Sequence, residues 1–108
     1  MDSVKEIIKN ILSEYVEFFG IQPNMEIEAI FDDEKGHYEL LQHGWIGNRR
    51  VHGVFLHLDV KGEKIWIQHD GTSEGIATEL MAAGISPKQI ILAFRSPSER
   101  EGGIFAVA

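Results

Sequence analysis

Four stretches of alternating polar and apolar residues follow one another between Met25 and about His69, and only short turns separate them. The turns are residues 32–36, 47–48 and 61–63. Antiparallel neighbours can be joined by turns this short, whereas a parallel pair needs a crossover of about a dozen residues or more. The sequence therefore predicts a four-stranded antiparallel meander, which the rest of the chain must accommodate.

The alternation also predicts which side chains share a face of each strand. The strands are expected over residues 25–31, 37–46, 51–60 and 64–69. Successive side chains of a strand point to opposite faces, so every second residue belongs to the same face. In the third strand this rule assigns four apolar residues to one face: Val54, Leu56, Leu58 and Val60.

An amphipathic helix is predicted over residues 4–19, where apolar residues recur at spacings of three and four. Asp2 or Ser3 is expected to cap its first free amides, and Gly20 is expected to end it. The apolar side of this helix is the natural cover for one face of the meander. A second helix is expected after the fourth strand, with Thr72 or Ser73 as its cap.

The chain after the second helix is predicted to return to the sheet. Gly84 is expected to end that helix, and the run Ser86-Pro87-Lys88-Gln89 has the cap, first-turn proline and capping-box glutamine of a single helical turn. Residues 90–94 are predicted as a strand, residues 96–103 as a polar loop and residues 104–107 as a short last strand.

The predicted fold class is therefore α+β. It consists of an N-terminal helix, a four-stranded antiparallel meander, a second helix and one or two returning strands. Residues 1–108 are expected to form a single domain, because this length suffices for one hydrophobic core.

Charge and composition narrow the classes of function. The chain has 10 basic and 17 acidic side chains, a net charge of −7, and no cysteine, so thiolate catalysis and disulfides are excluded. The chain has no apolar run near the length of a bilayer span and begins without a secretory pattern, so we expect a cytoplasmic protein. DNA binding would need a local basic patch, and Arg49 with Arg50 is the one present in sequence. The acidic balance favours a protein partner over direct nucleic-acid contact.

Residues spread over nearly the whole chain, and densest between Tyr38 and Phe94, match one family in order and spacing. They are Tyr38 with Leu40 and Leu41, Gly44-Trp45, Arg50-Val51, His57 to Val60, Lys64 to Thr72, Gly75-Ile76-Ala77, Glu79-Leu80, Gly84-Ile85, Pro87, Ile90 to Phe94 and Phe105 to Ala108. Together they resemble the XisI family, small cyanobacterial proteins described as controlling factors for excision of the fdxN DNA element. The chain departs from the family pattern at Ser73, Ala93 and Arg95 and in the loop 98–103. These departures bear on any function of the last twenty residues, not on the fold.

The resemblance implies an accessory role in programmed excision of a DNA element, with a separate recombinase performing the strand chemistry. XisI-like proteins are often paired with XisH, a partner that resembles nucleases. A pairing in which this small acidic chain restrains a nuclease-like XisH is a hypothesis, and it agrees with the charge of −7. The resemblance implies no cofactor.

The histidines suggest an enzymatic alternative. His57 and Asp59 are expected on one face of the third strand, and His69 ends the next strand, so a hairpin would bring the three together. Such a set is typical of metal binding or proton transfer, and it would suit a small metal-dependent or His/Asp hydrolase. However, the chain has no compact metal motif, and strand histidines often only form hydrogen bonds, so we expect neither a metal nor a catalytic site.

Four further residues are candidates for contact with a partner: Trp45, Arg50, Trp66 and Gln68. Tryptophan and arginine are enriched at interface hot spots, although core packing is the favoured role for both tryptophans. Arg50 has Glu39, Asp59 or a phosphate as possible partners. Gly44, Gly47 and Gly53 lack the context of a phosphate loop and are expected in a bulge and turns.

Three functions thus stay open: a non-enzymatic regulator that binds another protein, a hydrolase using His57, Asp59 and His69, and a DNA-binding factor using Arg49 and Arg50. The first is the expected one. Self-association through a free strand edge is compatible with it.

Overall fold

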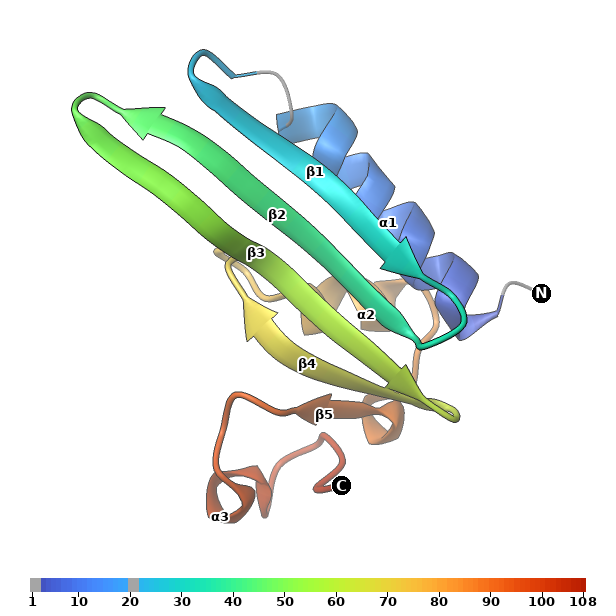
Figure 1. The fold of residues 1–108 in the computed structure, drawn as a ribbon. Helices are drawn as coiled ribbons and strands as arrows, with labels where there is room; N and C mark the ends of the chain where they lie inside the picture. Colours follow the sequence, from blue (N-terminus) through green and yellow to red (C-terminus); the bar gives the residue numbers. More distant parts are fainter. Residues whose placement is uncertain (1–2, 20–21) are drawn as a thin grey trace.

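The sheet contains five strands in the order β1-β2-β3-β4-β5 (Figure 1). The computed structural model describes residues 3–19 and 22–108. The strands are β1 (Met25–Asp32), β2 (His37–Ile46), β3 (Arg49–Lys61), β4 (Lys64–Asp70) and β5 (Ile90–Leu92). The first four pair antiparallel, which confirms the predicted meander, and β5 pairs parallel to β4.

Two helices cover one face of this sheet. They are α1 (Val4–Phe19) and α2 (Ile76–Ala82), and both lie behind the sheet in Figure 1. The predicted N-terminal helix is confirmed, and the Ser3 hydroxyl accepts a hydrogen bond from the Glu6 amide at 3.2 Å. Asp2 and the predicted stop at Gly20 lie outside the described residues. The 3-10 turn η1 (Pro87–Gln89) has the predicted capping box.

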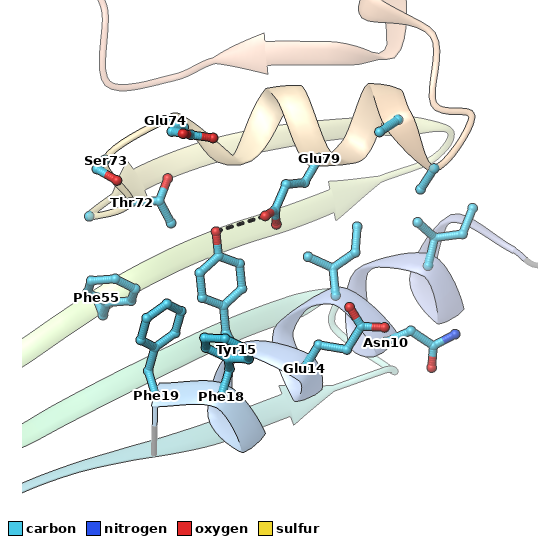
Figure 2. A pocket seen from close by; sticks show the side chains of 15 residues that line it. Asn10, Glu14, Tyr15, Phe18, Phe19, Phe55, Thr72, Ser73, Glu74 and Glu79 are labelled. Carbon is cyan, nitrogen blue, oxygen red and sulfur yellow. Dashed lines mark hydrogen bonds between the residues drawn. The ribbon is translucent and has the colours of Figure 1, made fainter. Parts of the chain in front are cut away.

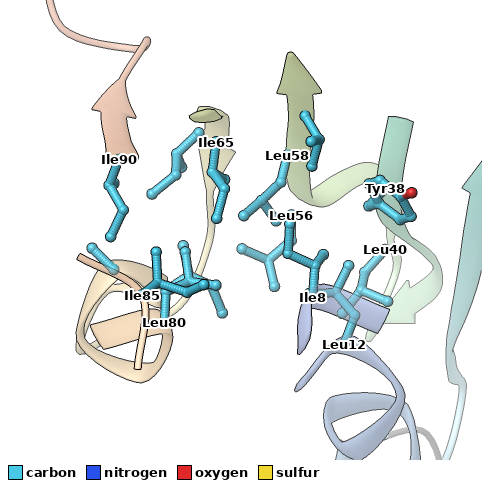
Figure 3. Packing of buried hydrophobic residues seen from close by; sticks show 14 residues of the cluster. Ile8, Leu12, Tyr38, Leu40, Leu56, Leu58, Ile65, Leu80, Ile85 and Ile90 are labelled. Carbon is cyan, nitrogen blue, oxygen red and sulfur yellow. The ribbon is translucent and has the colours of Figure 1, made fainter. Parts of the chain in front are cut away.

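The core fills the space between the helices and the sheet (Figure 3). α1 contributes Ile8 and Leu12, and α2 contributes Ile76 and Leu80, all fully buried. The sheet contributes side chains of every strand from β2 to β5: Tyr38, Leu40, Leu56, Leu58, Val60, Ile65, Ile67 and Ile90. Each large apolar side chain buried in this way contributes roughly 1.5–3 kcal/mol. We call the helix-covered side the inner face and the opposite side the outer face.

A β-bulge in β3 corrects the predicted facing of Val54. The β2–β3 register shifts between Leu40, which pairs with Leu56, and Leu41, which pairs with Val54. The shift leaves Phe55 as the extra residue of the bulge, so Val54 shares the outer face with Leu41, while Leu56 faces the core. Phe55 itself packs against the edge of the core.

The cap of α2 also differs from the prediction. Neither Thr72 nor Ser73 is the N-cap, because the helix begins at Ile76 and Gly75 occupies that position without a side-chain cap. Instead, the Asp70 carboxylate reaches forward and accepts hydrogen bonds from the Ile76 amide at 2.8 Å and the Thr72 amide at 3.0 Å. At the other end, Gly84 follows the helix with φ 101°, as a helix stop requires.

The C-terminal region contains one short returning strand, and the rest of it differs from the prediction. The strand predicted over residues 90–94 ends at Leu92, and the predicted polar loop contains a short helix, α3 (Pro97–Arg100), with a Ser96–Glu99 capping box. Residues 104–107 are not a strand. Within this segment the Ala106 amide donates to the Ile90 carbonyl at 2.9 Å, while the Val107 carbonyl accepts from the Arg100 guanidinium. This segment is therefore held to β5 by a backbone hydrogen bond and to α3 by the Arg100 side chain.

No helix in the described ranges combines the length and the apolar character that crossing a bilayer requires.

We predict that Gly44→Ala destabilises the fold. A Cβ at Gly44 would lie 2.0 Å from the Asn24 carbonyl oxygen and 2.7 Å from the Met25 sulfur, so the β1–β2 pair would have to separate locally. The expected loss is about 2–3 kcal/mol in the free energy of unfolding, measured by urea titration. Gly53→Ala is the matched control, because nothing lies within 4 Å of its added Cβ. Equal losses in the two variants would refute the close approach as the cause.

We predict that Asp70→Ala costs about 1–2 kcal/mol in the free energy of unfolding, because it removes the acceptor for the first amide of α2. Ser73→Ala should leave that free energy unchanged. A larger loss for Ser73→Ala than for Asp70→Ala in urea titrations would show that Ser73 is the cap.

Candidate functional site

All five histidines lie on the outer face of the sheet. The core residues Leu56 and Leu58 point inward, so their neighbours His57 and Asp59 point outward. The strand register then places the remaining histidines on the same side through the pairs His37–Asp59, His43–His52 and His57–His69. The helices thus cover the inner face, and the outer face carries the imidazoles.

Asp59 is the centre of a polar cluster on that face. Its Oδ1 lies 2.6 Å from Nδ1 of His37 and 2.9 Å from Nε2 of His57. Its Oδ2 accepts a hydrogen bond from Nε2 of Gln68 at 3.1 Å. A fourth group, Oε1 of Glu39, lies 3.5 Å from the other ring nitrogen of His57. We call His37, His57 and Asp59 the Asp59 cluster.

The surroundings of Asp59 keep its carboxylate ionised. Only 8% of the residue is exposed, and this burial opposes ionisation. Hydrogen bonds and charge attraction from His37 and His57 outweigh the burial, so the pKa of Asp59 is held below its usual range. A buried carboxylate that stays charged is stabilised by its hydrogen-bond donors. Removing a donor therefore lowers the stability of the fold.

The cluster differs from the predicted set of His57, Asp59 and His69. His57 and Asp59 do meet, but His69, although opposite His57 in the register, is exposed and makes no hydrogen bond to either within the described residues. His37 takes the third place, because the bulge at Phe55 shifts the β2–β3 pairing and brings His37 opposite Asp59.

The predicted partner-binding residues fall into two pairs. Trp45 and Arg50 lie opposite each other near the β2–β3 turn, with the Arg50 guanidinium 5.6 Å from the centre of the Trp45 ring. Trp45 is 50% exposed, so the core-packing role predicted for it is wrong. Arg50 pairs with the Trp45 ring and the Gly44 carbonyl, not with Glu39 or Asp59.

Trp66 and Gln68 lie on the outer face of β4. Trp66 pairs with Asp59 in the register and is outside the core cluster, so core packing is also wrong for this residue. Lys61 and Arg100 lie over its ring, at 4.9 and 5.8 Å from the ring centre. Gln68 occupies a second bulge, between the His57–His69 and Leu58–Ile67 pairs, and points to Asp59.

A groove of about 940 Å³ runs between α1 and α2 on the helical side (Figure 2). Sequence analysis had not identified it, since its walls come from distant segments. Tyr15, Phe18 and Phe19 of α1 line one side, and Phe55 and the 71–74 loop close the end. Phe18 is 83% exposed and packs edge-on against Phe19, at 5.2 Å between ring centres.

The polar groups of the groove are acidic. Glu14, Glu74 and Glu79 line it, and none of its described lining residues is lysine or arginine. The Tyr15 hydroxyl donates to Oε1 of Glu79 at 3.1 Å and so spans from α1 to α2. Burial and the nearby Glu79 carboxylate raise the pKa of Tyr15 to about 12, so this hydroxyl remains a donor at neutral pH.

Comparisons with known proteins identify the family and support the fold of the chain. The sequence model described as "XisI protein" matches residues 1–107, and the chain belongs to the XisI family. Among solved structures, a XisI-like protein from Anabaena variabilis ATCC 29413 superposes with a TM-score of 0.87 at 31% identity, over 96% of this chain and 95% of that one. The fdxN element excision controlling factor XisI from the same organism gives a TM-score of 0.81 at 34% identity, with the same coverage. The comparison with curated proteins found no match.

We predict that the stability contributed by Asp59 depends on pH. The pKa of Asp59 is lowered in the folded chain, so its contribution is present above the unfolded pKa of about 3.9 and is lost as the pH falls through the folded pKa. Asp59→Asn should cost about 1–3 kcal/mol in the free energy of unfolding at pH 7, and less at pH 3. Urea titrations at both pH values, with the exposed Glu34→Gln as control, test this. A penalty independent of pH would show that ionisation is not its source.

Proposed function

We propose that this chain is a non-enzymatic accessory protein that acts in the cytoplasm by binding another protein. The partner is a XisH-like protein, and the setting is programmed excision of a DNA element, as the name of the Anabaena variabilis relative indicates for that protein. The groove between α1 and α2 carries this proposal, because it exposes aromatic rings beside the core.

Phe18 and Phe19 give the groove its binding capacity. Both are exposed, at 83% and 41%, although each belongs to a helix whose other side is buried in the core. Contiguous exposed aromatic surface is typical of interaction sites, and large aromatic anchors dominate interface energetics. Two packed helices with a trough between them suit an amphipathic helix, which would set its apolar side on the rings.

The charge of the groove specifies the occupant further. Glu14, Glu74 and Glu79 line it without a cationic neighbour among the described lining residues, and the chain as a whole carries −7. A segment with lysine or arginine flanking its apolar side would complement these carboxylates. We therefore assign to the groove a basic amphipathic helix of the XisH-like partner.

The two other functions have less support. The hydrolase hypothesis used His57, Asp59 and His69, but His69, although paired with His57 in the register, is exposed and forms no hydrogen bond with either of them within the described residues. The DNA-binding hypothesis required a basic stripe, but Arg49 and Arg50 are neighbours on β3 and point to opposite faces of the sheet. The outer face, to which Arg50 belongs, also carries Glu26, Glu28 and Glu39.

We predict that Phe18→Ala weakens binding to a purified XisH-like protein at least tenfold, since it removes an aromatic anchor of the groove without changing the charge. Affinity would be measured by titration calorimetry. Phe94→Ala is the matched control, because Phe94 is also exposed, at 49%, but follows β5 and does not line the groove.

Thermal unfolding of both variants would verify that they fold, and exposure of Phe18 makes a large loss of stability unexpected. Absence of any complex with the wild-type chain would refute the proposed function. A complex that both variants form with wild-type affinity would retain the partner but refute the groove as its site.

A further inference from the structure

We propose that His37, His57 and Asp59 form a binding site for a divalent transition-metal ion of the zinc class on the outer face of the sheet. The site uses three protein ligands and leaves one position open to water. It is independent of the groove, which lies on the opposite side of the molecule.

The donor atoms are those that such ions prefer. Two imidazole nitrogens and a carboxylate oxygen suit Zn²⁺ and its neighbours, whereas Ca²⁺ and Mg²⁺ favour oxygen alone. One ligand atom from each of the three residues can be chosen so that all three lie within 4.8 Å of one another. Ligands of a tetrahedral zinc ion lie about 3.3 Å apart, given bonds of about 2.0–2.1 Å. The present separations of 2.6 and 2.9 Å around Asp59 Oδ1 therefore need to open by less than 1 Å.

The groups behind the ligands are also arranged as in metal sites. A ligating histidine usually directs its second ring nitrogen to a carboxylate or carbonyl, which orients the ring and increases its basicity. Nδ1 of His57 lies 3.5 Å from the Glu39 carboxylate, and Asp59 Oδ2 is held by Gln68.

The sheet holds the ligands on a rigid frame with one open side. His57 and Asp59 alternate along β3, and His37 is paired directly opposite Asp59 on β2. The side chain of Asp59 is 11% exposed, but that of His37 is 51% exposed, so an ion can enter from solvent beside His37.

A second group, Glu26, Glu28 and His43, also brings three ligand atoms within 4.8 Å. Its carboxylates are 69% and 56% exposed and it has a single imidazole, so it lacks both the burial and the donor set of the Asp59 cluster. It serves as an internal comparison on the same face.

The test is titration of the untagged, EDTA-treated chain of residues 1–108 with ZnCl₂ by calorimetry, and with Co²⁺ by visible absorption. We expect one ion per chain and the absorption of tetrahedral Co²⁺. Affinity should fall as the pH decreases from about 7.5 to 6, because protons compete for the imidazoles.

His37→Ala should weaken binding at least tenfold, with circular dichroism to verify folding, because His37 also hydrogen-bonds Asp59. Asp59→Asn should do the same, with circular dichroism to verify folding. His69→Ala and His52→Ala, on the same face but outside the cluster, should bind as the wild type does. Absence of stoichiometric binding, or equal weakening in all four variants, would overturn the proposal.

Discussion

The pairing of β2 with β3 is the constraint on which the other features depend. The bulge at Phe55 shifts this pairing by one residue, so that Leu56 and Leu58 point to the helices and His57 and Asp59 point away from them. A one-residue slip in register moves every side chain of a strand to the opposite face of the sheet. Without the bulge, either Leu56 and Leu58 of β3 would face solvent, or Tyr38 and Leu40 of β2 would. The core and the Asp59 cluster are therefore two consequences of one register.

The same bulge connects the sheet to the groove. Phe55, the extra residue, contacts Tyr15 of α1, at 6.5 Å between ring centres, and its carbonyl accepts a hydrogen bond from the Gly71 amide at 2.8 Å. A Cβ at Gly71 would lie 2.7 Å from that carbonyl oxygen, so glycine permits this contact. This hydrogen bond fixes the loop that leads into α2 against β3. The sheet thereby sets the position of the end of the groove, which Phe55 and residues 71–74 form. The molecule thus has two distinct sides, an aromatic and acidic groove between its helices and an imidazole-rich face on the side of the sheet that no helix covers.

Local patterns predicted the elements well and the register poorly. The run Ser86-Pro87-Lys88-Gln89 predicted its helical turn, and the run Ser96-Pro97-Ser98-Glu99 contains the same signal for α3, although the polarity of its surroundings favoured a loop. His37 could not have been assigned to the site from the turn alone. Continuing from the pair Ile46–Arg49 without a bulge would place His37 opposite Leu58, on the wrong face for Asp59. Two further features could not be predicted from periodicity, because they depend on tertiary geometry. One is the hydrogen bond that Asp70 accepts from the Ile76 amide, six residues later in the chain. The other is the groove between α1 and α2.

We propose that the helical side of this XisI-family chain binds a protein partner. Hydrogen exchange of the chain with and without a XisH-like protein tests it most directly, because it reports which backbone amides the partner protects. We expect protection at residues 14–19 and 71–83, with β1 to β3 exchanging as in the free chain. Protection confined to the outer strands, or none in the presence of a saturating partner, would contradict it.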